Sequence, residues 1–553
     1  MKQKLIFFLY LIVLILPNLI LCITEAMPLA GKSALVLLPL GVYWTVLPMF
    51  FRLSRTFWCM LPILFLGAFN IVLSYLFGKG VIAVDMWLNL TTSSPAEMGE
   101  MLSQIYPAVV AVVLIYIPTL AYAAYDICRK TRLTVRFMKH QMCAGLAVLL
   151  LSLPITFMAA RSGRWTVLDD LFPVNVCYNL SLASERQSLS EEYPERSRDF
   201  VFDAVLTDTD TIPKVVMLVI GETSRACNWQ LYGYKRETTP LLAKTPNLTV
   251  FYDCMSQSNT THKSIPIFLS PATADNYDVL YHSKGILAAF NEAGFHTAFI
   301  SNEPRNNSFN DRLGEQAKEV LFLRDKIKRE TPMDSLLLPE IQNVLDSHKG
   351  NLFIVVHTYG SHSTYSDRYK RYQAHFTPDI VLKATKDNRD ILINAYDNTI
   401  RYTDSMLHRI IQQLQAQNRP AAMLFASDHG EDIYDDGRNL YLHASPWPSY
   451  YQLHIPLLAW TSNMYREMYA RRTERLESRT QEPLQTDCIF PTILGLGGIS
   501  TPYSQDSLAL TSDKYITKEK RTYLNDHNKP MTFDKCLEPE DFKAMETMGV
   551  RPY

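Results

Sequence analysis

The chain lacks three features that would assign it to a common class of protein. Its formal net charge is only −1 over 553 residues, so it has no basic excess of the kind that marks a nucleic-acid-binding protein. It has no internal repeat and no low-complexity tract, which argues against a solenoid or a disordered linker. Its nine cysteines include an odd set of five in the second part of the chain. We therefore expect no disulfide framework, and a bridge such as Cys488–Cys536 is the disfavoured alternative.

What the sequence does contain is a division into two unlike parts. The first 165 residues hold 13 Lys and Arg against 5 Asp and Glu, whereas the remainder holds 41 against 50. Twelve of the 13 histidines lie in the acidic second part, where histidine suits metal chemistry. The length accommodates a membrane domain together with one large or two ordinary soluble domains.

Five apolar runs in the first part are long enough to cross a hydrocarbon core of about 30 Å. They cover Leu5–Ile23, Ala34–Phe51, Phe57–Phe77, Ile105–Tyr125 and Met142–Ala160. The first run lacks a small-residue cleavage site and is followed by further runs, so we interpret it as a span and not as a cleaved signal. The sequence predicts a five-helix transmembrane domain over residues 1–160.

The loops between these runs differ in basic charge, which predicts their orientation. One set of loops is rich in basic residues: Lys2, Lys4, Arg52, Arg55, Arg129, Lys130, Arg132, Arg136 and Lys139. The opposite loops carry only Lys32 and Lys79, although Arg161 and Arg164 run against the pattern. Five spans from a cytoplasmic start place the second part of the chain outside the membrane, which in a bacterial cell is the periplasm.

The loop over residues 78–103 is longer than a hairpin needs. Asn89, Ser93 and Glu97 are spaced by four residues, so a helix would present them on one face. At the membrane interface such a face could hold a polar lipid headgroup. A solvated amphipathic turn is the alternative, and Pro95 weakens the prediction of a helix.

Beyond the spans, residues 161–211 are polar and charged and predict a surface helix and linker. From residue 212 to 553, apolar strand-like runs alternate with helical patterns. The runs are Val215–Ile220, His296–Ile300, Leu352–His357, Ala421–Ser427 and Leu457–Trp460. This alternation predicts an α/β domain with a mostly parallel sheet sandwiched by helices.

Two of these runs end on residues that bind metals. Glu222 follows Val215–Ile220 and one glycine, and Asp428-His429 follows Ala421–Ser427. Parallel strands end at one edge of the sheet, where open α/β sheets bind their ligands. One Glu, one Asp and one His leave a fourth zinc position open for a substrate or a nucleophile, as a catalytic site requires.

A nucleophile should lie near such a metal. The segment Ser256–Pro266 is rich in hydroxyl groups and follows a short apolar run. A hydroxyl bound to Zn²⁺ becomes acidic enough to attack phosphorus near neutral pH. Composition alone leaves four candidates open: Ser258, Thr260, Thr261 and Ser264.

Histidines form a further group. His357 and His362 follow the run Leu352–Val356, and His443 comes fifteen residues after Asp428. Such residues could bind a phosphoryl group, hold a second metal or transfer protons. Taken singly, each is equally typical of an ordinary structural histidine.

At these residues the sequence resembles the phosphoethanolamine transferases of Gram-negative inner membranes, which belong to the alkaline phosphatase and sulfatase superfamily and include colistin-resistance enzymes. The resemblance extends over nearly the whole chain. Its signatures, in order, are Gly221-Glu222-Thr223-Ser224-Arg225-Ala226, Tyr232-Gly233-Tyr234 through Thr238-Thr239-Pro240, Gly360-Ser361-His362, Asn394-Ala395-Tyr396-Asp397-Asn398-Thr399-Ile400, Ser427-Asp428-His429-Gly430-Glu431 and Tyr441-Leu442-His443.

The resemblance implies a role for particular residues. The family's zinc ligands fall on Glu222, Asp428 and His429, and its threonine nucleophile, five residues before a proline, falls on Thr261. Its substrate-site histidines fall on His362 and His443. Its lipid-binding polar trio falls on Asn89, Ser93 and Glu97, with Ser where the family usually has Thr.

The chain also departs from the family pattern. Many relatives have cysteines flanking the nucleophile loop, and here those positions are Gln257 and Ile267. The usual Gly-Thr-x-Thr-Ala pattern is Ser258–His262, which leaves Thr260 as a weaker rival nucleophile.

The implied reaction transfers phosphoethanolamine from phosphatidylethanolamine to a lipopolysaccharide component, either lipid A or a core sugar, through a phosphothreonine intermediate. The resemblance further implies one tightly bound Zn²⁺ with room for a second, a monomer in the inner membrane, a catalytic domain in the periplasm and no nucleic-acid partner. Three alternatives remain: a phosphoglycerol transferase or phosphodiesterase of the same superfamily, and an inactive membrane sensor. A true sulfatase is disfavoured, because residue 268 is Phe where its x-Pro-x-Arg motif needs Arg.

Overall fold

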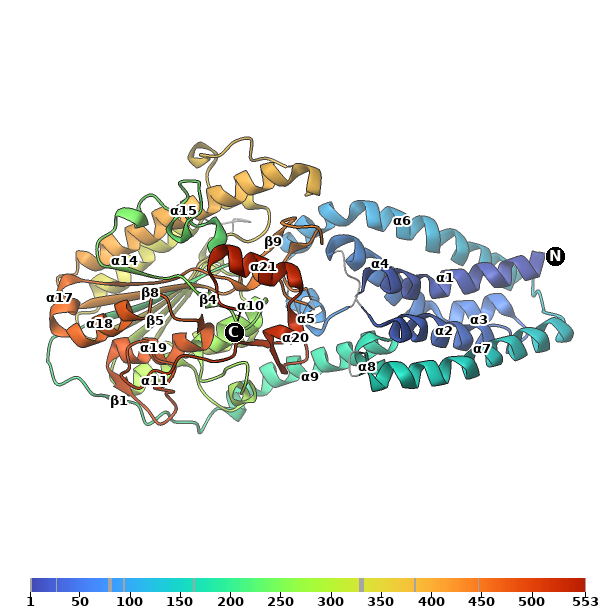
Figure 1. Ribbon diagram of the computed structural model, residues 1–553, viewed down its shortest axis with the longest axis horizontal. Coiled ribbons are helices and arrows are strands. Elements are labelled where there is room, and N and C mark those ends of the chain that lie inside the picture. The colour runs from blue at the N-terminus through green and yellow to red at the C-terminus, as the bar shows by residue number, and fades with distance from the viewer. Residues whose placement is uncertain are drawn as a thin grey trace. The chain divides into compact units, whose positions relative to one another are not determined.

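The computed structural model describes residues 2–25, 27–77, 82–92, 95–162, 165–327, 333–381, 384–445 and 447–552, with side chains except at residues 2, 76–77, 89–92 and 95–104. The chain divides into two compact units, residues 1–91 with 97–184 and residues 92–96 with 185–553. Figure 1 shows a helical unit and an α/β unit.

The first unit is built from helices that follow the apolar runs. They are α1 (Lys2–Thr24), α2 (Leu29–Val46), α3 (Leu53–Cys59), α4 (Leu61–Phe77), α5 (Val84–Thr92), α6 (Pro95–Cys128), α7 (Val135–Arg161) and α8 (Val167–Asp170). Within the described residues, four helices are long and apolar enough to cross a membrane, and the pair α3–α4 makes a fifth if it counts as one span. The predicted helical membrane domain is therefore confirmed, and its predicted number of five spans is reached when α3 and α4 count as one.

The third predicted span, Phe57–Phe77, is not one straight helix. Its helix axis bends by 61° between α3 and α4. Pro62 lies in the first turn of α4, where its missing N–H removes the hydrogen bond that would continue α3. The chain therefore turns at Met60, whose N–H instead bonds to Phe57 O at 3.0 Å.

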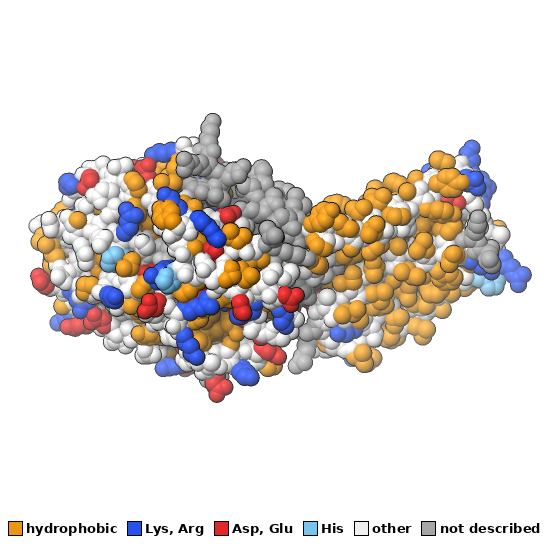
Figure 2. Space-filling view, turned by 90° about the horizontal axis from the view of Figure 1, so that it is seen from above, with side chains coloured by type: hydrophobic (Ala, Val, Ile, Leu, Met, Phe, Trp, Pro, Cys, Tyr) orange, Lys and Arg blue, Asp and Glu red, His pale blue; other side chains and the backbone are white. Residues whose placement is uncertain are grey.

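Two glycines bring α2 and α7 close together. A Cβ at Gly41 would lie 2.7 Å from Leu149 Cα, and one at Gly145 would lie 2.6 Å from Thr45 N. Small residues at helix contacts allow this approach inside membranes. Large apolar side chains cover the outside of the unit (Figure 2), including Phe65, Leu114 and Leu151. An apolar outer surface of this kind fits a lipid environment.

The second unit contains a seven-stranded sheet in the order β3-β11-β8-β2-β7-β5-β6. The strands are β2 (Val215–Gly221), β3 (Leu248–Phe251), β5 (His296–Ser301), β6 (Glu319–Phe322), β7 (Leu352–His357), β8 (Ala421–Ser427) and β11 (Leu457–Thr461). Five neighbours, from β8 to β6, are parallel. The predicted mostly parallel α/β sheet is therefore confirmed.

Strand β11 pairs antiparallel with both β8 and β3. A parallel neighbour needs a long crossover connection, usually a helix, and among the described residues between β8 and β11 the only helix is the four-residue α16 (Tyr450–Leu453). The chain consequently returns in the opposite direction.

Helices cover both faces of the sheet, as Figure 1 shows. The remaining helices of the chain are α9 (Val174–Arg196), which begins in the first unit, α10 (Thr261–Leu269), α11 (Ile286–Glu292), α12 (Phe309–Gly314), α13 (Leu323–Lys326), α14 (Leu337–Ser347), α15 (Arg389–Gln415), α17 (Asn463–Met468), α18 (Ala470–Ser478), α19 (Ile489–Gly497), α20 (Phe533–Cys536) and α21 (Pro539–Met548). Short strands form separate pairs: β1 (Val205–Leu206) with β13 (Ile499–Ser500), β4 (Cys254–Met255) with β12 (Leu484–Gln485), β9 (Asp432–Ile433) with β10 (Tyr441–Leu442), and β14 (Thr522–Leu524) with β15 (Pro530–Thr532).

The apolar runs are continuous because alternate residues enter two different cores. Along β2, Val216 and Leu218 pack with α11 and α19, whereas Val215 and Met217 pack with α14 and α15. A strand covered on both faces is apolar at every position. Each strand ends where its buried apolar run ends. The polar residues that follow the strands therefore lie at the edge of the sheet.

Candidate metal and phosphoryl-transfer site

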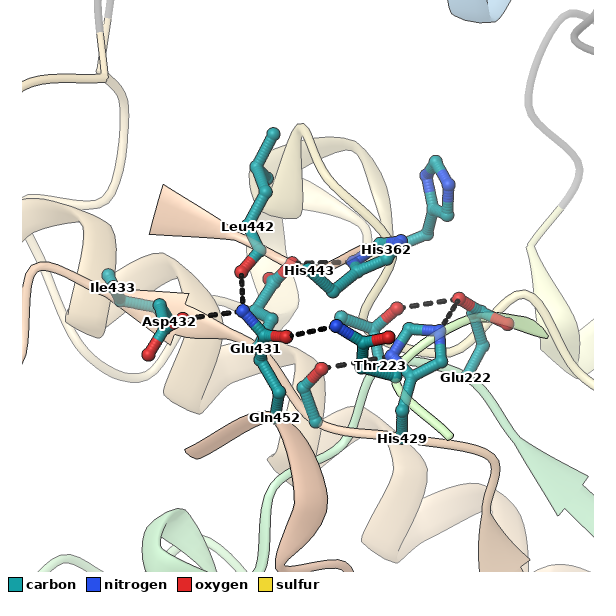
Figure 3. A network of polar contacts seen from close by, with 12 residues as sticks. Glu222, Thr223, His362, His429, Glu431, Asp432, Ile433, Leu442, His443 and Gln452 are labelled. Carbon is teal, nitrogen blue, oxygen red and sulfur yellow. Dashed lines mark hydrogen bonds and ion pairs between the residues drawn. The ribbon is translucent and has the colours of Figure 1, made fainter. Parts of the chain in front are cut away.

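The site begins with two neighbouring strands of the sheet. Glu222 follows β2 and Asp428-His429 follows β8, and the last residues of these strands, Gly221 and Ser427, are paired in register. Asp428 N–H donates to Gly221 O at 3.0 Å. The three predicted metal ligands therefore meet at the carboxyl edge of the sheet, and Figure 3 shows Glu222 and His429 facing each other.

Thr261 enters the same place from a different element. It is the first residue of α10, and its Oγ1 lies 3.3 Å from Glu222 Oε2 and 3.2 Å from His429 Nε2. Its rival Thr260 is buried, and its Oγ1 contacts Ser258 Oγ at 3.2 Å. The structure thus brings Thr261 to the predicted ligands and turns Thr260 toward the nucleophile loop itself.

The Asp428 carboxylate and the His429 ring present lone pairs at this point. The Asp428 Oδ1 atom accepts from Thr223 N at 3.0 Å and from His429 N at 2.7 Å. Its Oδ2 atom is buried and has no hydrogen-bond donor among the described residues. It lies 3.2 Å from His429 Nε2, whose own proton belongs on Nδ1, because Nδ1 donates to Gly430 O at 2.9 Å.

Electrostatics at these residues also favour a bound cation. Burial, together with the charges of Asp428 and Glu303, raises the pKa of the Glu222 carboxyl well above its usual value. Burial lowers the pKa of His429 to about 4, so its imidazole is neutral at pH 7. Two buried carboxylates, an imidazole lone pair and a hydroxyl make an oxygen and nitrogen donor set that suits Zn²⁺. The residues present therefore fit the predicted metal.

Two further histidines lie beside this group. The ring centroids of His443 and His429 are 4.2 Å apart, and those of His443 and His362 are 6.3 Å apart. His443 Nδ1 contacts Glu431 Oε2 at 3.3 Å (Figure 3). Burial and the nearby charge of Arg368 lower the pKa of His362 well below its usual value. Both predicted substrate-site histidines consequently line the same site.

Backbone conformation fixes the position of Glu222. Gly360 has φ of +47°, and a Cβ at this residue would lie 2.6 Å from Glu222 O. Ser361 N–H donates to Glu222 O at 2.9 Å. Thr223 itself has φ of +57°, a conformation that non-glycine residues rarely adopt and that clusters at functional sites.

Some residues of the site were not predicted from the sequence. Glu431 connects His443 with the hydroxyl of Tyr365. Glu303 was not predicted either: its ligand atom lies within 4.8 Å of those of Glu222 and of His357, the histidine that the sequence had offered for a second metal. Glu303 follows β5, so its place at the site could have been predicted from the rule that residues after parallel strands gather at one edge of the sheet. The network of Glu431 depends on contacts between distant segments and had no such signal.

The predicted interfacial trio cannot be placed. Ser93 lies outside the described residues, as do the side chains of Asn89 and Glu97. The nine cysteines are all free, including Cys488 and Cys536, for which a disulfide was the disfavoured alternative.

Comparison with known proteins identifies the family. The family model described as Sulfatase matches residues 214–499, which is more than half of the chain. The chain belongs to the sulfatase family. This match contains β2, β8 and α10, and therefore all four residues that converge at the candidate metal site.

Curated relatives of this sulfatase-family chain are phosphoethanolamine transferases. It is 32% identical over 304 residues to phosphoethanolamine transferase EptA of Escherichia coli K12, covering 53% of this chain and 54% of that protein. It is 27% identical over 320 residues to the Kdo(2)-lipid A phosphoethanolamine 7''-transferase of Salmonella typhimurium LT2, covering 55% of each. The chain thus spans about half the length of the curated relatives it matches.

Solved structures agree on the fold. The integral membrane lipooligosaccharide phosphoethanolamine transferase A of Neisseria meningitidis matches with a TM-score of 0.73 at 22% identity, over 92% of this chain and 98% of that one. The soluble domain of the same Neisseria protein matches with a TM-score of 0.51 at 28% identity, over 56% and 95%. The periplasmic domain of Escherichia coli EptC, solved as a complex with Zn, matches with a TM-score of 0.55 at 23% identity, over 62% and 98%.

Proposed function

We propose that this protein transfers phosphoethanolamine from phosphatidylethanolamine to a lipopolysaccharide component, lipid A or a core sugar. The observation that carries the proposal is the meeting of Thr261 Oγ1 with the Glu222 carboxylate and the unprotonated Nε2 of His429. The buried, donor-free Asp428 Oδ2 supports it further. An alcohol beside such a donor set is suited to nucleophilic attack on phosphorus.

Glu222, Asp428, His429 and Thr261 would hold the metal. A bound Zn²⁺ supplies charge neutralisation and lowers the pKa of an alcohol. Thr261 Oγ1 gives its proton to His362 or His443 and bonds to phosphorus as the bond from phosphorus to the glycerol oxygen breaks. That oxygen takes a proton, which His362 or His443 is placed to supply, and leaves as diacylglycerol.

In the second half of the reaction an acceptor oxygen bonds to phosphorus and the Thr261 Oγ1–P bond breaks. His362 and His443 are the groups that receive the acceptor proton and contact the phosphoryl oxygens. Burial lowers the pKa of His362, so its imidazole is neutral at pH 7 and has a nitrogen lone pair free to accept that proton. Because both substrates are lipids, membrane attachment places them near the site.

The proposal extends to the domain organisation and the membrane location of the chain. We propose a five-span domain over residues 1–160, a bridging helix and linker over 161–211 and a periplasmic catalytic domain over 212–553, in a monomer of the inner membrane. Asn89, Ser93 and Glu97, in the loop over residues 78–103, would contact a lipid headgroup. The apolar helices of the first unit support the membrane location.

The test compares Thr261→Ala with Thr260→Ala in the purified full-length enzyme. With phosphatidylethanolamine of labelled headgroup, we expect Thr261→Ala to release no diacylglycerol and Thr260→Ala to remain active. Mass spectrometry of the active proteins should show a phosphoethanolamine adduct on the peptide that contains Thr261. Full activity of Thr261→Ala would refute the assignment. Preferential consumption of labelled phosphatidylglycerol would instead favour a phosphoglycerol transferase.

A further inference from the structure

A second group of metal-ligating side chains lies at the opposite edge of the sheet. His296 is the first residue of β5, Glu319 is the first residue of β6, and His348 directly follows α14 before β7 begins. Because β5, β6 and β7 are parallel to β2, these residues lie at the amino edge, whereas Glu222 follows the carboxyl end. A six-residue strand spans roughly 20 Å, so this group is separate from the proposed catalytic site.

The three side chains converge on one point. His296 Nε2 lies 2.7 Å from Glu319 Oε1, and His348 Nε2 contacts the same oxygen. The two imidazole rings are stacked, with centroids 3.6 Å apart and planes inclined by 17°. All three ligand atoms lie within 4.8 Å of one another. The geometry therefore presents two ring nitrogens and one carboxylate oxygen to a single small volume.

The surrounding backbone holds these residues in place. His296 N–H donates to Asn351 O at 2.8 Å, which ties the start of β5 to the segment before β7. Lys318 N–H donates to Thr297 Oγ1 at 3.0 Å, and Lys318 Nζ donates to Phe295 O at 2.8 Å. Thus the neighbours of His296 and Glu319 are bonded to each other, and the backbone keeps both side chains within reach of one ion.

Charge and exposure favour a cation here. The side chains of His296, Glu319 and His348 are 26%, 43% and 25% exposed, which leaves an open side for water and for entry of an ion. Two neutral imidazoles and one carboxylate with an open fourth position are a donor set for Zn²⁺ and unlike the all-oxygen sets of Mg²⁺.

We propose that His296, Glu319 and His348 bind a divalent transition-metal ion of the Zn²⁺ class. Each imidazole carries its proton on Nδ1 when its Nε2 binds the ion. The ion joins the start of β5 and the edge strand β6 to the turn that leads into β7. Its effect is on the stability of this sheet edge and not on phosphoryl transfer.

The experiment measures the zinc content of the full-length protein after equilibrium dialysis at one fixed free zinc concentration. We expect His348→Ala and Glu319→Gln each to hold one zinc ion per chain fewer than the wild type, with transferase activity unchanged. His282→Ala, which removes an exposed histidine elsewhere in the same unit, is the matched control and should hold as much zinc as the wild type.

A second measurement separates this site from the catalytic one. In the Asp428→Asn background, zinc should still raise the Tm, magnesium should not, and adding His348→Ala should remove the zinc effect. The Tm of each variant measured with chelator present, and hence without bound zinc, checks that the variant remains folded. Equal zinc contents of wild type, His348→Ala and Glu319→Gln, or a zinc effect on Tm that survives His348→Ala, would overturn the proposal. Neither result would bear on the role of Thr261.

Discussion

The hydroxyl oxygen of Thr261 lies 3.2 Å from Nε2 of His429, although 168 residues separate the two in the chain. This contact joins the start of a helix to the end of a strand. It requires a hydroxyl at residue 261 and tolerates loss of the neighbouring methyl group. The consequence can be measured with two conservative substitutions.

We predict that Thr261→Ser retains part of the transferase activity, because serine keeps the oxygen that faces His429 and Glu222. Thr261→Val has nearly the shape of threonine but no nucleophile, so its activity should fall by at least about 1,000-fold, the order of loss typical of removing a catalytic nucleophile. Diacylglycerol release from phosphatidylethanolamine is the assay. Equal activities of the Ser and Val variants would contradict the assignment.

We predict that Asp428→Asn binds one zinc ion per chain fewer than the wild type and loses activity. Removal of an outer-shell partner already costs about 10- to 100-fold in metal affinity, so loss of a direct charged ligand should exceed that. Metal analysis after dialysis measures the change. Asp325→Asn, which alters an exposed carboxylate paired with Arg305, should leave both metal content and activity unchanged.

Gly360→Ala should damage the site without changing any of its donor atoms. The new Cβ would lie 2.6 Å from Glu222 O, and the backbone φ of +47° disfavours alanine as well. We expect a loss of roughly 1–3 kcal/mol in the free energy of unfolding together with weaker zinc binding. Gly350→Ala is the control, because a Cβ there would meet nothing within 4 Å. Unfolding curves and zinc titration of both variants supply the comparison.

His454 should make stability depend on pH. Tyr450 O–H contacts its Nδ1 at 2.7 Å, and its Nε2 lies 3.1 Å from Tyr252 O, so the folded protein holds the neutral ring with the proton on Nε2. Burial lowers its pKa to about 4. In the unfolded chain the ring takes a proton below its ordinary pKa of 6.5. Its contribution to stability is therefore complete above pH 6.5 and is lost as the pH falls toward 4.

The size of this effect is on the order of 3 kcal/mol for a shift of this extent. We predict that the stability difference between wild type and His454→Gln narrows between pH 7 and pH 5. Urea unfolding at both pH values measures it. A difference that stays constant would show that the buried ring of His454 is not the source.

The parts of the fold that could be predicted were those set by local pattern. Continuous apolar runs such as Val215–Ile220 indicated strands buried on both faces, and the parallel arrangement then predicted that Glu222 and Asp428 would meet. The antiparallel β11 was not predictable from its own sequence, because an apolar strand has the same composition in either direction. The break near Met60 was hidden in an otherwise uniform apolar run.

The candidate site, like the fold, was predicted only in part from the sequence. Strand ends alone indicated Glu222, Asp428 and His429, but the choice of Thr261 among four hydroxyl residues came from family resemblance. The contacts of Tyr365 and Glu431 with His443 arise from segments far apart in sequence, and no local spacing encodes them. The grouping of His296, Glu319 and His348 could not be predicted from the sequence either, because only the order of the strands in the sheet brings these residues together.

Gln257 lies beside the nucleophile loop, at a position where the family resemblance implies a cysteine. Its side chain donates to Asp487 Oδ2 at 3.0 Å and accepts from Ala274 N at 3.0 Å, while its carbonyl accepts from Leu524 N at 2.7 Å. These bonds anchor the loop to three other segments without covalent cross-linking. The loop at Gln257 is thus held by hydrogen bonds, which a thiol reductant does not break.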